Sequence, residues 1–167
     1  MNEVGRSPRI YRVIYPVLER ERIASESRAN GLDPVLVASL IKQESNFNPR
    51  ATSVAGARGL MQIMPAVGQQ LARRKGISGY SVEMLHDPEI NVALGTMHLR
   101  NLMATYPNIE RSLAAYNAGG SRVTRWSTKA GMNDPEVFTE RIPFVETRGY
   151  VRAIVRNRAF YQALYSW

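Results

Sequence analysis

Hydrophobic and polar positions alternate along most of the chain with the period of an α-helix. Between residues 10 and 30, aliphatic residues recur among arginines and glutamates, and Pro16 predicts an interruption or a new helix start. Asp33-Pro34 is a start signal, because aspartate caps a first turn and proline suits the first helical position. We expect the following helix to cover residues 35–47, where Asn48-Pro49 ends it.

The same signals predict further helices downstream. Residues 49–65 lack a long period and are rich in small residues, which is typical of a loop or a small hairpin. The sequence therefore predicts one mainly α domain with a small irregular or β insert around residues 49–65. The later helices are expected over residues 66–74, from His86-Asp87-Pro88, over residues 112–118 up to Gly119-Gly120, from Asp134-Pro135, and from Ile142-Pro143 to about Tyr165.

Composition excludes several classes of protein. The chain has 167 residues, 44% of them hydrophobic, which is enough for one buried core. It contains no cysteine, so disulfides, cysteine-ligated zinc and cysteine nucleophiles are excluded. No apolar run is long enough for a membrane span, and residues 1–22 have no apolar core of a secretory signal. The protein is therefore expected to stay inside the cell, or to be a mature form or an excised domain.

The chain is strongly basic. Lysine and arginine number 22 against 14 acidic residues, which gives a net charge of +8. Such a surface attracts polyanions, including nucleic acid, anionic lipid or an acidic polymer such as a bacterial wall. The cations are scattered, however, and the densest cluster is Arg73-Arg74-Lys75 with no recognition module around it. The charge permits a nucleic-acid partner but does not indicate one.

Motifs for common cofactors do not occur in the sequence. It contains no phosphate-binding GxxxxGK[ST] loop, no GxGxxG and no GxSxG element. Its two histidines, His86 and His98, lie twelve residues apart and form no HExxH pair. We therefore expect no metal and no cofactor.

Glu44 is the candidate for acid–base chemistry. It lies three residues after Ile41, four after Leu40 and eight after Leu36, so it extends the apolar stripe of its helix. Desolvation and the negative end of the helix would both raise the pKa of such a carboxyl, which could then act as a general acid. The alternative, from spacing alone, is a solvated glutamate in a frayed last turn.

The segment that follows Glu44 contains no acidic residue as far as Val82. It supplies hydroxyls, amides and glycines, which suit a neutral, hydroxyl-rich ligand such as a sugar; a tight surface turn would explain them equally well. If Glu44 is an acid, no carboxylate close to it in sequence stands opposite it as nucleophile or base.

Three motif blocks resemble those of the soluble lytic transglycosylase family. They occur in order, span most of residues 30–165, and are accompanied by Tyr15-Pro16 near the start. This resemblance implies a lysozyme-like, mainly helical fold with a groove for a glycan strand. It implies a catalytic domain over residues 23–167 and a helical extension over residues 1–22. The blocks are ESNFNP at residues 44–49 with GLMQIMP at residues 59–65, AYNAG at residues 115–119, and IPF at residues 142–144 with ETRGYV at residues 146–151.

The resemblance also implies roles for individual residues. Glu44 matches the family's catalytic acid and base, and Tyr116-Asn117 matches a pair that faces it. Glu146 matches a second acidic residue that contacts substrate without acting as nucleophile. The positions that would line the groove around the reacting sugars are Ser53, Gln62 and Met64.

Other interpretations of these residues remain open. Met61 and Met64 are of a type usually found in core packing, and one of them is expected there. Tyr116 is also consistent with a buried tyrosine whose hydroxyl is satisfied, and Glu146 with an ion pair to Arg148 at a helix start. The sequence departs from the family pattern at Ala66-Val67 and at Gly120-Ser121, neither of which touches the implied chemistry.

The resemblance implies a peptidoglycan lytic transglycosylase. Such an enzyme cleaves the β-1,4 bond between N-acetylmuramic acid and N-acetylglucosamine and forms 1,6-anhydromuramic acid with a single glutamate. The expected partner is the glycan strand, in the periplasm or cell envelope, with the chain acting as a monomer and without nucleic acid. The alternatives are a goose-type lysozyme, which hydrolyses the same bond with water, and a non-catalytic glycan-binding module of an envelope assembly.

Overall fold

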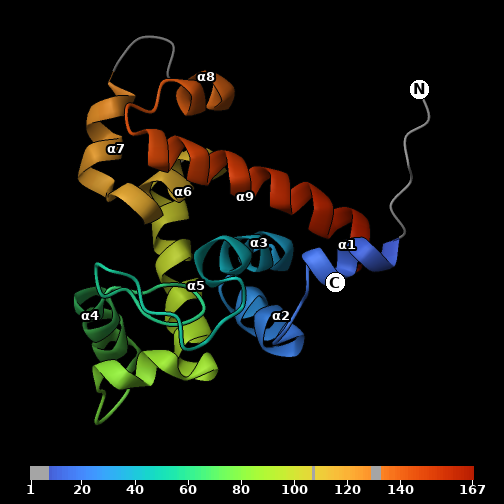
Figure 1. Ribbon diagram of the computed structural model, residues 1–167. Coiled ribbons are helices and arrows are strands. Elements are labelled where there is room, and N and C mark those ends of the chain that lie inside the picture. Colours follow the sequence, from blue (N-terminus) through green and yellow to red (C-terminus); the bar gives the residue numbers. More distant parts are fainter. Residues whose placement is uncertain (1–7, 107, 129–132) are drawn as a thin grey trace.

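Helices form nearly all the regular structure of the described residues. The computed structural model describes residues 8–106, 108–128 and 133–167 (Figure 1). The prediction of a mainly α fold with an irregular insert is confirmed, since β structure in those ranges amounts to antiparallel bridges from Arg58 to Thr52 and to Ile63. The elements are α1 (Pro8–Ile14), α2 (Arg20–Ala29), α3 (Pro34–Ser45), α4 (Pro65–Lys75), the 3-10 helix η1 (Val82–His86), α5 (Pro88–Thr105), α6 (Ile109–Ala118), α7 (Gly120–Ser127), α8 (Pro135–Glu140) and α9 (Val145–Leu164).

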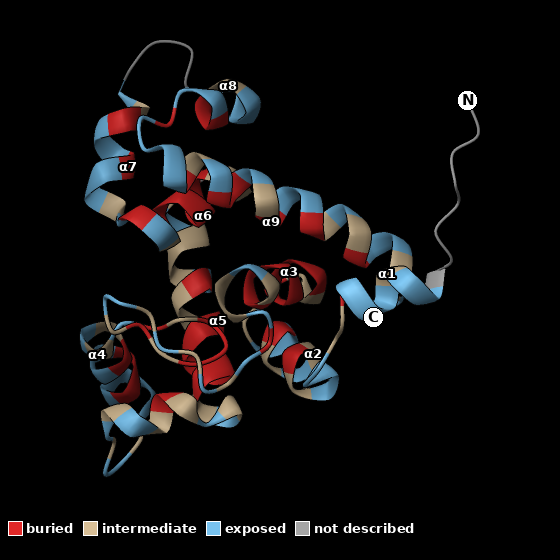
Figure 2. Ribbon diagram, viewed as in Figure 1, coloured by how far each residue is buried: buried red, intermediate tan, exposed pale blue. Residues whose placement is uncertain are grey.

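Helix α3 lies in the middle of the molecule and contacts α9 and α2 (Figure 1). Seven consecutive residues, Val35–Ile41, are buried, so α3 is covered around its whole circumference and not along one stripe only (Figure 2). Its start is fixed by Asp33, which caps the backbone N–H of Val35 at 2.9 Å and pairs with Arg158 of α9 at 3.0 Å. The central helix is thereby tied to α9 at its first turn.

Helix α3 ends two residues earlier than the sequence predicts. Asn46 and Phe47 have φ angles of 52° and 62°, in the left-handed region that no helix continues through. Asparagine tolerates this conformation and serves here as the C-cap, and the reversal turns Phe47 back into the core. The predicted helix over residues 35–47 is therefore wrong at its C-terminal end.

One other boundary differs from the prediction, and two short helices were not predicted. Helix α6 begins at Ile109, because Asn108 Oδ1 accepts a 3.0 Å hydrogen bond from the backbone N–H of Arg111 and caps the first turn. Gly119 ends α6 as predicted, with φ at 88°, but α7 starts at the next residue. The sequence indicated neither α7 nor η1, since both are short and carry few periodic apolar positions.

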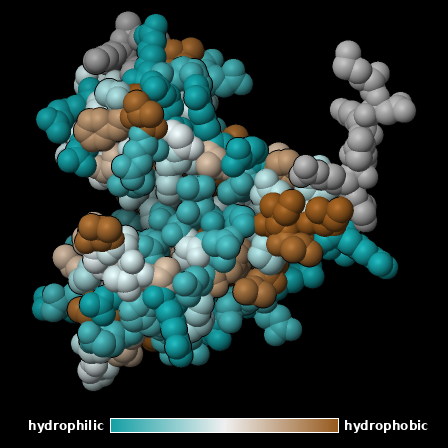
Figure 3. Space-filling model, viewed as in Figure 1, coloured by the Kyte–Doolittle hydropathy of each residue, from teal (hydrophilic) through white to brown (hydrophobic). Residues whose placement is uncertain are grey.

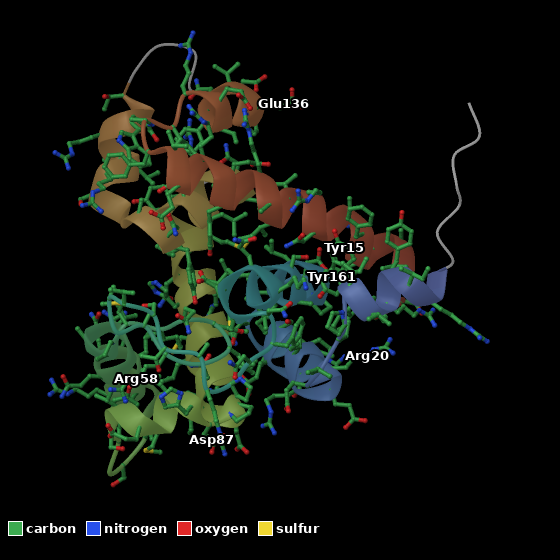
Figure 4. All side chains as sticks on the ribbon, viewed as in Figure 1. Tyr15, Arg20, Arg58, Asp87, Glu136 and Tyr161 are labelled. Atoms are coloured by element: carbon green, nitrogen blue, oxygen red, sulfur yellow. The ribbon has the colours of Figure 1, made fainter. Side chains whose placement is uncertain are left out.

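Helix α9 runs along one side of the molecule and contacts α3, α6, α8 and α1. At its far end Phe160 stacks on Tyr15 at a ring distance of 4.6 Å, and the Tyr161 hydroxyl donates to the Pro16 carbonyl at 2.8 Å. Figure 4 shows Tyr15 and Tyr161 at this junction. The N-terminal helix thus packs on the C-terminal one, and a division of the chain between residues 22 and 23 stays a prediction. In the described part of the chain, no helix is both long enough and apolar enough to cross a membrane.

Candidate active site

The last turn of α3 places the Glu44 carboxyl against α9. The Tyr150 hydroxyl donates a 2.5 Å hydrogen bond to Glu44 Oε1. Burial raises the pKa of Glu44 to about 7, and the hydrogen bond from Tyr150 lowers it, so burial is the larger effect. Glu44 is partly buried, not a solvated residue of a frayed turn. A carboxyl with this pKa can both donate and accept a proton near neutral pH.

Two tyrosines flank Glu44, and they have different partners. The Tyr116 hydroxyl donates to the backbone carbonyl of Met61 at 2.8 Å, whereas the Tyr150 hydroxyl makes the bond to Glu44. Burial, together with the nearby charge of Glu44, raises the pKa of both tyrosines well above their usual value. Both hydroxyls therefore stay protonated. Sequence reasoning missed Tyr150, although it lies four residues after Glu146 and so on the same side of α9.

The segment between α3 and α4 folds back on itself and forms one wall of the site. Gln62 has φ at 46°, and its side-chain Nε2 donates to the carbonyls of Ala51 at 3.2 Å and Gly59 at 2.9 Å. The Ser53 hydroxyl accepts a 3.0 Å hydrogen bond from the backbone N–H of Ala57. Both predicted groove residues therefore also hold the shape of the loop that presents them.

The two methionines of this loop divide between core and surface. Met61 is fully buried and packs on Gly95 of α5, where an added Cβ would lie 2.3 Å from the Met61 sulfur. Met64 is 42% exposed. The expectation that one of the pair belongs to the core is confirmed for Met61, and Met64 stays available to a ligand.

Asn91 of α5 anchors this loop from behind, and the sequence analysis did not single it out. Its Oδ1 accepts from the Met61 backbone N–H at 2.8 Å, and its Nδ2 donates to the carbonyls of Arg58 at 2.9 Å and Leu85 at 2.7 Å. Gly59 approaches so closely that an added Cβ would lie 2.2 Å from Asn91 Nδ2. The one signal in the sequence was a polar residue among apolar positions of a predicted helix.

The remaining wall comes from α6 and α9. The Thr147 hydroxyl donates to Asn117 Oδ1 at 2.7 Å, which joins the two helices beside the site. Glu146 is exposed in the first turn of α9. Arg148 donates to the carbonyl of Ile142 at 3.3 Å, so its guanidinium fixes the chain before α9 and does not form the ion pair with Glu146 that was the alternative interpretation of that residue.

These walls enclose a cleft of about 410 Å³. In Figure 3 the surface is hollowed between the part formed by α7, α8 and the start of α9 and the part formed by α4 and the loop before it. Every site residue predicted from the sequence lines this cleft, so the structure brings together positions that lie up to about a hundred residues apart. The lining residues are Glu44, Ser53, Val54, Ala55, Ala57, Gln62, Met64, Tyr116, Asn117 and Glu146.

The lining contains two carboxyls in different surroundings. Glu44 is partly buried and bonded to Tyr150, while Glu146 is exposed at the rim. Among the described residues, no group of three or more histidines, cysteines, aspartates or glutamates could hold a metal ion. The arrangement therefore suits proton transfer by one carboxyl to a ligand bound along the cleft.

Comparison with known proteins identifies the family. A family model described as the transglycosylase SLT domain matches residues 21–138. The soluble lytic murein transglycosylase of Escherichia coli is 42% identical over 127 residues, which are 74% of this chain and 20% of that protein. A transglycosylase of the enterobacteria phage PRD1 is 38% identical over 109 residues, 65% of this chain and 37% of that protein.

Solved structures agree with these sequence matches. The 70 kDa soluble lytic transglycosylase of Escherichia coli superposes with a TM-score of 0.86 and 35% identity, over 92% of this chain and 25% of that one. An inactive mutant of the lytic transglycosylase Slt from Pseudomonas aeruginosa gives the same TM-score at 32% identity. The chain thus spans about a fifth to a quarter of the length of the bacterial relatives and 37% of the phage protein. The resemblance seen in the three motif blocks and the expected lysozyme-like fold are confirmed, and the chain belongs to the transglycosylase SLT domain family.

Proposed function

We propose that this chain is a peptidoglycan lytic transglycosylase that uses Glu44 as its single acid and base. The observation that carries the proposal is the partly buried carboxyl of Glu44, with a pKa of about 7, in a cleft of about 410 Å³. The relatives at 41–42% identity are named soluble lytic murein transglycosylases, and others are named membrane-bound lytic murein transglycosylases. These names support a glycan strand of peptidoglycan as substrate and the periplasm or cell envelope as location.

The first step is protonation of the glycosidic oxygen. Glu44, whose pKa is raised to about 7 and which therefore can carry a proton near neutral pH, donates that proton to the oxygen between N-acetylmuramic acid and N-acetylglucosamine. The bond from that oxygen to the muramyl anomeric carbon breaks, and the N-acetylglucosamine unit leaves with a hydroxyl. Tyr150 keeps its hydrogen bond to Glu44 and stabilises the carboxylate that results.

The second step closes a ring within the muramyl residue. Glu146, the other carboxyl of the lining, is exposed at the rim, so the substrate's own N-acetyl carbonyl oxygen is the proposed group that stabilises the positive charge at the anomeric carbon. Ionised Glu44 then takes the proton from the muramyl 6-hydroxyl, whose oxygen bonds to the anomeric carbon. The product is 1,6-anhydromuramic acid, Glu44 is protonated again, and no water is consumed.

The other lining residues would hold the strand. Ser53, Gln62 and Asn117 offer hydroxyl and amide groups for sugar hydroxyls and N-acetyl groups, and Met64 offers an apolar surface. Glu146 at the rim would contact substrate without entering the reaction. We expect the chain to act as a monomer without metal or cofactor, and its net charge of +8 to favour an anionic wall.

Mass spectrometry of a sacculus digest tests the proposal. The wild type should release muropeptides that end in anhydromuramic acid, and Glu44→Gln should release almost none while still sedimenting with sacculi. Ordinary reducing muramic acid would instead identify a goose-type lysozyme activity. Binding without any product from the wild type would identify a non-catalytic module, and loss of lysis on chelation would show that a metal is needed.

A further inference from the structure

The end of the molecule opposite the cleft carries an exposed apolar surface, which we call the α1 face. It consists of Ile10, Val13 and Ile14 of α1 with Leu18, whose exposed fractions are 48%, 80%, 40% and 54%. The three helical residues follow the i, i+3, i+4 spacing and so share one side of α1. Figure 3 shows a hydrophobic cluster, in brown, at the place where Figure 1 has α1. A contiguous apolar surface of this kind marks an interaction site.

The other side of α1 is fixed to the body of the protein. The ring of Tyr11 stacks on Phe160 of α9 at 5.7 Å, and that of Tyr15 on the same ring at 4.6 Å. The Tyr165 hydroxyl donates to the Tyr15 carbonyl at 2.8 Å. Because these contacts hold the helix in place, the α1 face points outward as a consequence of packing and not of fraying.

Two arginines, Arg12 and Arg20, lie beside the α1 face. Arg12 donates to the Leu164 carbonyl at 3.3 Å, and the Arg20 guanidinium lies 5.5 Å from the centre of the Trp167 ring (Figure 4). Both arginines therefore contact carbonyls and aromatic rings. Neither guanidinium forms an ion pair with a carboxylate of the described residues. Glu19, which follows Leu18, is already paired with Arg22 at 3.0 Å, and Glu21 follows Arg20 in the sequence. The surface is therefore apolar in the middle and positive at the edge.

We propose that the α1 face binds the surface of an anionic lipid bilayer. The aliphatic side chains would enter the boundary between headgroups and acyl chains, and Arg12 and Arg20 would lie against the phosphates. Trp167 and Tyr165, beneath the two guanidiniums, are of the aromatic type that favours this boundary. A second copy of the chain fits the surface less well, because two positive edges would be brought together.

This contact leaves the cleft accessible. The α1 face and the cleft lie at opposite ends of the molecule (Figures 1 and 3), so a bound molecule presents its cleft away from the bilayer. The inference does not depend on the proposed activity, and it concerns peripheral binding and not a membrane span.

Vesicle sedimentation tests the proposal. The full chain is mixed with vesicles made of equal parts phosphatidylglycerol and phosphatidylcholine, and with vesicles of phosphatidylcholine alone. Wild type should sediment with the anionic vesicles and at least about tenfold less with the neutral ones. The double variant Ile10→Ser/Val13→Ser should bind anionic vesicles at least roughly tenfold more weakly, because two aliphatic contacts with hydrocarbon are removed. Val145→Ser is the matched control, since Val145 is 72% exposed at the other end of α9.

Several outcomes would overturn the inference. Wild type that remains in the supernatant with anionic vesicles refutes it directly. Equal losses in Val13→Ser and Val145→Ser, or no loss in either, would show attraction by net charge alone. Concentration-dependent dimers that Val13→Ser abolishes would show that a second copy covers the α1 face. Circular dichroism checks that each variant is folded, and the single Val13→Ser variant replaces the double one if the latter unfolds.

Discussion

Replacing Glu44 with glutamine should stabilise the protein by an amount that depends on pH. The pKa of Glu44 rises from 4.5 in the unfolded chain to about 7 in the folded one, because folding removes the carboxylate from water. A raised carboxyl pKa means that ionisation opposes folding. The destabilisation is absent below about pH 4.5, grows between the two pKa values and is complete above about pH 7.

The size of the effect follows from the same two values. At about 1.36 kcal/mol per pKa unit, a shift from 4.5 to about 7 corresponds to about 3 kcal/mol. Glutamine carries no charge and its amide oxygen can still accept the bond from Tyr150, so Glu44→Gln should recover most of this energy at pH 8. For a chain of this size the gain corresponds to roughly 10 °C in melting temperature.

Urea unfolding of both proteins between pH 4 and pH 8 measures the difference. The two free energies of unfolding should be similar at pH 4 and diverge up to neutral pH. Glu140→Gln is a control of opposite sign: hydrogen bonding to Arg152 lowers the pKa of Glu140, so its loss should lower stability at neutral pH and matter less in acid. A constant difference across pH, or a less stable Glu44→Gln protein at pH 8, would refute the burial argument.

Three further predictions concern the surroundings of Glu44. Tyr150→Phe removes a hydrogen bond that lowers the pKa of Glu44, so Glu44 should keep its proton to a higher pH. The pH above which lysis is lost should therefore rise by about one to two pH units, as measured by the pH profile of turbidity clearing. Asn91→Leu removes three hydrogen bonds behind the loop and should lower the free energy of unfolding by about 3 kcal/mol or more, with loss of lysis. An unchanged melting temperature would show that Asn91 does not anchor the loop. Gly59→Ala should destabilise the protein far more than Gly56→Ala in the same melting assay. Both glycines have positive φ, but the added Cβ would lie 2.1 Å from the Leu85 carbonyl oxygen at position 59 and has no atom within 4 Å at position 56.

Capping and periodicity in the sequence predicted much of the fold. Asp33, Asp87 and Asp134 each precede a proline, and each caps the helix that follows it. These signals are local, so one sequence suffices to read them. The end of α3 was not predicted, because the left-handed turn at Asn46 and Phe47 accompanies the burial of Phe47 in a core made of residues distant in the sequence.

The candidate site was likewise predicted only in part. Motif blocks predicted the residues that line the cleft, and the structure brings all of them together. The partners of those residues were not predictable: Tyr150 meets Glu44 across 106 positions, and Asn91 meets Met61 across 30. Such pairings are set by how α9 and α5 pack, and a single sequence carries no local signal of them.

The separation of α3 and α9 along the sequence has a consequence for synthesis on the ribosome. Glu44 emerges early, but Tyr150 and Glu146 are made more than a hundred residues later. Until α9 has been translated and has docked on α3, Glu44 has neither its hydrogen-bond donor nor the wall that removes it from water. A nascent or truncated chain that lacks α9 should therefore have a glutamate of ordinary acidity and no assembled cleft, so the proposed activity requires that α9 has been made and has docked.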